Sequence, residues 1–131
     1  MRLLLDTHIA IWSIVEDPRL TTRARALIAD PNNEIVVSVV ALWEIAIKHR
    51  LARLGRVDMP ISARTANEHF AGAGFRILDI ATDHAIAVES LPILHHDPFD
   101  RILVAQALTE PLRLITHDTK VAAYSDTIIL V

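Results

Sequence analysis

The sequence predicts a single α/β domain built around a parallel β-sheet. Short apolar runs alternate along the chain with longer segments of helical spacing, and this alternation is typical of α/β folds. The chain has 131 residues, of which 52% are hydrophobic, so it has enough apolar mass for one core and too little length for two. We therefore expect residues 1–131 to form one domain, a central parallel sheet of about five strands flanked by helices and joined by right-handed crossovers.

The first expected strand is Leu3-Leu4-Leu5, which stops at Asp6. A short continuous apolar run is typical of a strand that is buried on both faces of a parallel sheet. Four later runs have the same character, at residues 35–37, 76–78, 112–115 and 127–131.

Helical patterns fill the segments between these runs. The expected helices cover residues 7–15, 21–29, 39–54, 61–71, 82–89, 99–110 and 119–124. Glycine and proline mark turns at residues 58–60, 72–74 and 91–92.

Composition excludes several classes of protein. The absence of cysteine rules out disulfides, thiolate metal sites and a cysteine nucleophile, so any metal has to use oxygen or imidazole ligands. No apolar stretch approaches the roughly 20 residues that span a bilayer, and the first residues lack the pattern of a signal peptide. We expect a soluble, cytoplasmic protein without a membrane partner, although its net charge of -3 is not that of a typical nucleic-acid binder.

Acidic residues follow two of the expected strands. Asp6 comes directly after the first strand, and the run at 112–115 leads into Thr116, His117 and Asp118. In open parallel sheets, ligands bind in the crevice beyond the carboxyl ends of the strands. If both strands are central, Asp6 and Asp118 face one crevice.

Two further acids lie on apolar helix stripes. Helical spacing places Glu44 on the same face as Val40 and Ile47, and it places Asp100 beside Leu103. A buried carboxylate costs several kcal/mol unless it has a cation or strong donors. We therefore expect both side chains to serve a site.

Each acid also has a simpler interpretation. Asp6 and Asp118 can cap the helices that follow them, and Glu44 can pair with Lys48 one turn later. Asp97 suits a helix N-cap because a proline follows it at the first helical position. Asp100 then falls at the third position, where a capping-box bond back to Asp97 is the alternative to a site role.

Four acids at one site repel one another unless a divalent cation neutralises them. Mg²⁺ or Mn²⁺ fits, because these ions take oxygen ligands and bind phosphate substrates. Such a pocket suits phosphodiester hydrolysis, in which the metal activates a water and stabilises charge on the phosphate. Lys48, Arg50 and Arg53 are then candidates to hold a nucleic-acid backbone nearby.

Four motifs in this order and spacing resemble the PIN-domain ribonucleases, and among them the VapC toxins of bacterial toxin–antitoxin pairs. The resemblance covers most of the chain. It is carried by LLLDTHIAIW at the start, SVVALWEIAIKHRLARL at 38–54, LPILHHDPFDRILVAQA at 91–107 and LITHD at 114–118.

The resemblance implies a function and a set of site residues. Asp6, Glu44, Asp100 and Asp118 would bind Mg²⁺ or Mn²⁺, and the hydroxyl of Thr116 would help to order the site. It implies an endoribonuclease that acts on RNA, dimerises with a second copy and is silenced by a small antitoxin protein. Which RNA is cut, and whether one ion or two take part, does not follow from these motifs.

Two rival hypotheses stay open. In a receiver-like domain, Asp6 would be phosphorylated and Thr116 and Lys120 would sense the phosphate, but this leaves Glu44 unexplained. Alternatively, a non-catalytic PIN-fold module would bind a protein partner through its groove.

The histidines and tryptophans receive ordinary interpretations. The seven histidines show no zinc-binding spacing, so we expect structural or solvent-facing roles for them. Trp12 and Trp43 lie on apolar helical patterns and are expected in the core or at a dimer interface.

Overall fold

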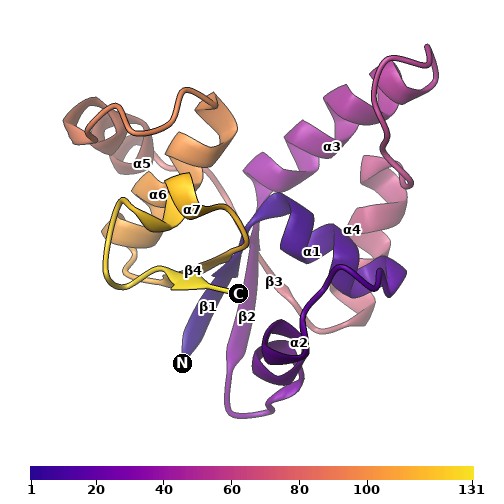
Figure 1. Ribbon diagram of the computed structural model, residues 1–131, viewed down its shortest axis with the longest axis horizontal. Coiled ribbons are helices and arrows are strands. Elements are labelled where there is room, and N and C mark those ends of the chain that lie inside the picture. Colours follow the sequence, from indigo (N-terminus) through magenta and orange to yellow (C-terminus); the bar gives the residue numbers. More distant parts are fainter.

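A computed structural model describes residues 1–131 and confirms the α/β prediction. It contains one sheet of five parallel strands in the order β3-β2-β1-β4-β5 (Figure 1). The strands are β1 (Arg2–Leu5), β2 (Glu34–Ser38), β3 (Arg76–Leu78), β4 (Arg113–Thr116) and β5 (Ile129–Leu130). The first strand therefore lies at the centre of the sheet, with β4 directly beside it.

Seven α-helices and one short 3₁₀ helix connect the strands. They are α1 (Thr7–Val15), α2 (Thr22–Ala29), α3 (Val39–Ala52), α4 (Ala63–Gly72), α5 (Thr82–Ala87), η1 (Val88–Ser90), α6 (Pro98–Thr109) and α7 (Thr119–Ala122). None of them is long and apolar enough to cross a membrane.

Both faces of the sheet are covered by helices. Leu3 and Leu5 of β1 belong to a core cluster that includes residues of α1 to α4. Leu4, between them, belongs to a second cluster with residues of α6 and α7. All three leucines are fully buried, which explains why the strand is uniformly apolar instead of alternating.

The predicted elements all exist, and their ends differ by a few residues. The helix expected at 39–54 ends at Ala52, and the one expected at 82–89 divides into α5 and η1. The helix expected from residue 61 begins at Ala63, because the Ser62 hydroxyl accepts a hydrogen bond from the Thr65 N–H and acts as its N-cap.

The two tryptophans have different environments. Trp12 is buried in the core, as predicted. Trp43 is 57% exposed, so it is not a core residue; its ring packs edge to face against Phe99, across the gap between α3 and α6. Its predicted alternative place, a dimer interface, stays a prediction.

Candidate active site

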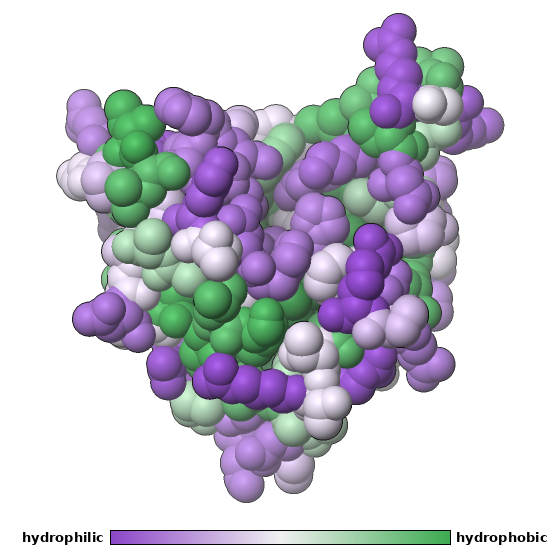
Figure 2. Space-filling view, viewed as in Figure 1, coloured by the Kyte–Doolittle hydropathy of each residue, from purple (hydrophilic) through white to green (hydrophobic).

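A polar cavity of about 250 Å³ opens beyond the carboxyl edge of the sheet, where β1 and β4 end side by side. No apolar side chain lines it; the lining residues are Asp6, His8, Glu44, Lys48, His95, Asp97, Asp100, His117 and Asp118. Figure 2 shows the molecule hollowed between the side that carries α5 and α6 and the side that carries α3, with hydrophilic residues in the hollow. All four predicted acids therefore meet in one cavity.

Asp6 is placed by the junction between β1 and α1. It is 3% exposed and caps α1, with Oδ1 accepting a hydrogen bond from the His8 N–H at 3.3 Å. Its other oxygen, Oδ2, accepts a hydrogen bond from the hydroxyl of Thr116 at 2.6 Å. Thr116 is fully buried at the end of β4, so it fixes the orientation of Asp6 without lining the cavity.

Glu44 reaches the cavity from α3 and is 3% exposed. Its Oε2 accepts a hydrogen bond from the ammonium group of Lys48, so the simple i,i+4 pair does form. Its Oε1 is buried and has no hydrogen-bond partner. The ion pair thus satisfies one of the two oxygens of a carboxylate that would otherwise be costly to bury, and it leaves the other oxygen without a partner.

Asp97 and Asp100 lie at the start of α6. Asp97 is the N-cap, with Oδ1 accepting hydrogen bonds from the N–H groups of Phe99 at 2.8 Å and Asp100 at 3.4 Å. The backbone N–H of Asp97 donates to Nδ1 of His95, not to Asp100. The capping-box alternative for Asp100 is therefore wrong, and its carboxylate faces the cavity.

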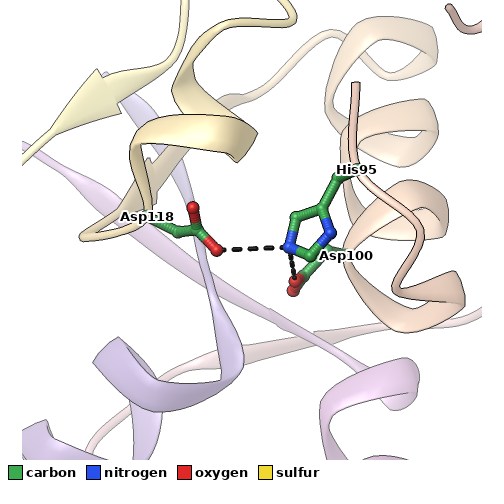
Figure 3. A group of neighbouring side chains, drawn as sticks. All are labelled: His95, Asp100 and Asp118. Carbon is green, nitrogen blue, oxygen red and sulfur yellow. Dashed lines mark hydrogen bonds and ion pairs between the residues drawn. The ribbon is translucent and has the colours of Figure 1, made fainter. Parts of the chain in front are cut away.

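Asp118 caps α7 through Oδ1, which accepts a hydrogen bond from the Lys120 N–H at 2.8 Å. Its Oδ2 lies 3.2 Å from Nε2 of His95, and the same nitrogen lies 3.0 Å from Oδ2 of Asp100 (Figure 3). These three side chains come from the segment before α6, from α6 itself and from the turn after β4, and they converge within the cavity.

The carboxylates perturb one another's protonation. Burial, together with the smaller effects of the negative charges on Asp6, Asp97, Glu44 and Asp118, raises the pKa of Asp100 to about 8. Burial also raises the pKa of Asp6, against the opposing effect of its hydrogen bond from Thr116. The site therefore holds more negative charge than it can keep at neutral pH without a cation.

Asp118 shows the opposite shift. Burial is the largest single influence and raises the pKa, but the hydrogen bonds from the Lys120 backbone and from His95, with the charge interaction with His95, together outweigh it and lower the pKa. Asp118 thus stays ionised where Asp100 takes up a proton. Such divergence between neighbouring acids is common at functional sites.

The donor set fits a hard divalent cation. Four carboxylates from separate parts of the chain place oxygen atoms in the cavity, which are the ligands such a cation prefers, and the buried Oε1 of Glu44 has no hydrogen-bond partner. Asp100 and Asp118 also lie close enough to one another, together with His95, to share an ion.

Three histidines of the cavity wall were missed by the sequence prediction, which gave them structural or solvent-facing roles. His8 and His117 flank Asp6 and Asp118 in the sequence, and their rings pack against Trp12. His95 lies five residues before Asp100. The sequence offered one signal for them: each of the three lies within five residues of a predicted acid.

Lys48 forms the ion pair with Glu44 that the sequence offered as an alternative. Its role in holding a nucleic-acid backbone stays a prediction. Arg50, in the last turn of α3, and Arg53, directly after its end, are exposed and remain candidates for the same role.

Fold and cavity together define a small α/β protein with a carboxylate-lined site at the carboxyl edge of a parallel sheet. The chain belongs to the PIN-domain family, since residues 3–126 match that family. It is similar to Ribonuclease VapC22 from Mycobacterium tuberculosis, with 29% identity over 122 residues that cover 92% of this chain and 90% of the relative.

Solved structures share the fold. VapBC2 from Rickettsia felis, bound to a promoter DNA fragment, superposes with a TM-score of 0.70 at 19% identity and covers 100% of this chain and 98% of its own. A toxin–antitoxin complex from Klebsiella pneumoniae gives a TM-score of 0.62 at 27% identity and covers 97% and 95%. The predicted fold and family are thus confirmed.

Proposed function

We propose that this protein is a metal-dependent endoribonuclease and the toxin of a toxin–antitoxin pair. The observation that carries the proposal is the meeting of Asp6, Glu44, Asp100 and Asp118 in one polar cavity. The similarity to a ribonuclease over nine-tenths of the chain supports the reaction, and the similarity to toxin–antitoxin complexes supports the partner.

The four acids would bind Mg²⁺ or Mn²⁺. When bound, the ion would lower the pKa of a water and stabilise charge on the scissile phosphate. Thr116 holds one oxygen of Asp6 in place, and Lys48 balances the charge of Glu44, so both act on the orientation and charge of the ligands. The electrostatic repulsion that raises the pKa of Asp100 favours cation binding, because a cation relieves it.

RNA is the proposed substrate, and a small antitoxin and a second copy of the chain are the proposed protein partners. The receiver-like alternative is disfavoured, because the chain matches the PIN-domain family and because that alternative gives no role to Glu44, which lines the cavity. The non-catalytic alternative predicts metal binding without RNA cleavage.

The proposal is tested with purified protein freed of antitoxin. We expect it to cleave cellular RNA with Mg²⁺ or Mn²⁺ and not with EDTA, and mapping of new 5′ ends identifies the RNA. Asp100→Asn should abolish cleavage while the fold persists. Asp126→Asn is the matched control, since it makes the same chemical change at an exposed position outside the cavity. If wild type and Asp100→Asn cut alike, or neither cuts, the nuclease proposal is refuted.

A further inference from the structure

His95 places one ring nitrogen against two of the proposed metal ligands. Its Nε2 is hydrogen-bonded to Oδ2 of Asp118 at 3.2 Å and lies 3.0 Å from Oδ2 of Asp100 (Figure 3). The imidazole is mostly buried, with 18% of the side chain exposed. One N–H thus faces two carboxylate oxygens that come from separate elements of the fold.

The other ring nitrogen decides the chemistry of this contact. Nδ1 accepts a hydrogen bond from the Asp97 N–H at 3.3 Å, so Nδ1 carries a lone pair and the proton of the neutral ring is on Nε2. A histidine that binds a metal through one nitrogen normally donates a hydrogen bond through the other. In His95, Nδ1 instead accepts a hydrogen bond from the Asp97 N–H. Nε2 therefore carries the proton, which suits it to donate to carboxylates and not to bind a metal.

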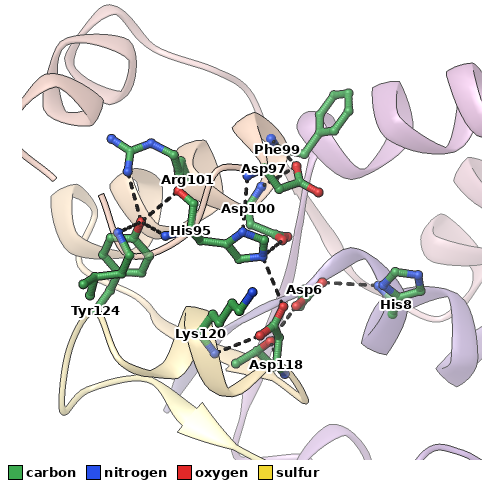
Figure 4. Close-up of polar contacts among 12 residues, drawn as sticks. Asp6, His8, His95, Asp97, Phe99, Asp100, Arg101, Asp118, Lys120 and Tyr124 are labelled. Atoms are coloured by element: carbon green, nitrogen blue, oxygen red, sulfur yellow. Dashed lines mark hydrogen bonds and ion pairs between the residues drawn. The ribbon is translucent and has the colours of Figure 1, made fainter. Parts of the chain in front are cut away.

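The backbone of His95 is held independently of its ring. Its N–H donates to the Tyr124 hydroxyl at 3.0 Å, and Arg101 donates to the same hydroxyl at 3.0 Å (Figure 4). Arg101 also binds the backbone oxygen of Pro92 at 2.9 Å. These contacts aim the imidazole into the cavity and would survive its removal.

Each carboxylate oxygen of Asp118 already accepts one hydrogen bond. Its Oδ1 accepts the N–H of Lys120 and caps α7, and its Oδ2 accepts His95. Of the two bonds, the one to His95 is the longer, and it belongs to a side chain rather than to a helix terminus. A cation that binds Asp118 and Asp100 therefore competes with His95 before it competes with the helix cap.

We propose that His95 is a positioning residue that links Asp100 to Asp118 and competes with a divalent cation for their Oδ2 atoms. The inference rests on the cation site of the proposed function. It assigns His95 two effects: it holds the two carboxylates together, and it lowers the affinity of the site for the ion, so that the ring must move aside when the ion binds.

The test is the affinity for Mn²⁺, measured by titration calorimetry on the full-length protein without RNA. His95→Ala should bind Mn²⁺ about tenfold more tightly than wild type, because a hydrogen bond to a charged group no longer has to be broken. His95→Gln keeps an N–H donor and should fall between the two. His96→Ala is the matched control; His96 is exposed, lies outside this cavity and should leave the affinity unchanged.

The opposite outcomes overturn the inference. Unchanged or weaker Mn²⁺ binding by His95→Ala refutes competition, and so does the absence of Mn²⁺ binding in both proteins. Electron spin-echo spectroscopy of bound Mn²⁺ adds a structural readout: a ¹⁴N coupling that disappears in His95→Ala means that His95 is a ligand. Unchanged Mn²⁺ binding by His95→Ala, with metal-dependent RNA cleavage intact in wild type, refutes the competition alone, whereas absence of Mn²⁺ binding in both proteins also counts against the metal-dependent nuclease proposal.

Discussion

Replacing Asp100 by asparagine should stabilise the protein in the absence of divalent ions. Burial and four neighbouring acids raise the pKa of this carboxyl from 3.8 to about 8, so the folded state disfavours its ionised form. Asparagine has nearly the same shape and no charge to place in the cavity. The variant that we expect to destroy activity is therefore also expected to raise stability.

The pKa shift sets the magnitude and the pH window. In the unfolded chain the carboxyl loses its proton near pH 3.8, whereas in the folded protein it keeps it to about pH 8. Between these values the folded state binds the extra proton, so wild-type stability falls as pH rises and levels off above pH 8. The full shift corresponds to at most roughly 5–6 kcal/mol; screening by water in the open cavity reduces this, and we expect about 1–3 kcal/mol at pH 8.

The assay is urea unfolding of both proteins in EDTA at several values between pH 5 and pH 8.5. The excess free energy of unfolding of Asp100→Asn over wild type should be small at pH 5 and grow steadily to pH 8. In a thermal melt, the same excess should raise the melting temperature by a few degrees per kcal/mol. Asp126→Asn, the exposed control, should show no such trend. A difference that stays flat across this range, or a less stable Asp100→Asn at pH 8, would refute the electrostatic reasoning.

Three further predictions concern capping, buried support and the ion. Asp97→Ala should cost about 0.5–2 kcal/mol in urea unfolding, because α6 loses its N-cap, while RNA cleavage persists; loss of cleavage with intact folding would contradict this division of labour. Thr116→Val should lose about 1–3 kcal/mol and slow cleavage, because Asp6 loses a buried donor; equal unfolding midpoints and rates would exclude that role. Excess Mg²⁺ should raise the melting temperature of wild type more than that of Asp100→Asn; equal shifts would place the ion elsewhere.

Much of the fold was predictable because local pattern and tertiary environment agree. The run Leu3-Leu4-Leu5 is apolar at every position since β1 is covered on both faces. Asp97 and the proline after it predicted the start of α6, because capping depends on neighbouring residues alone. The ends of elements were less predictable where a serine cap, as at Ser62, shortened a helical pattern.

The candidate site was predictable in part. Asp6 and Asp118 follow strands, and a parallel sheet brings strand ends to one edge, so their meeting follows from topology. Glu44 was found because a charge on an apolar stripe is conspicuous. The i,i+4 spacing also offered its ion pair with Lys48, but only side-chain positions in the folded molecule could show that this pair forms while the carboxylate still reaches the cavity.

By itself, the sequence determined the α/β class, the four candidate acids and the likeness to the PIN domain, because each depends on spacing along the chain. Tertiary structure alone decided the directions of the side chains: the hydrogen bond from Thr116 to Asp6, the free oxygen of Glu44 and the place of His95 between Asp100 and Asp118. These contacts join residues from different elements. Their distances, burial and pKa shifts arise from packing in three dimensions, which spacing along one chain does not specify.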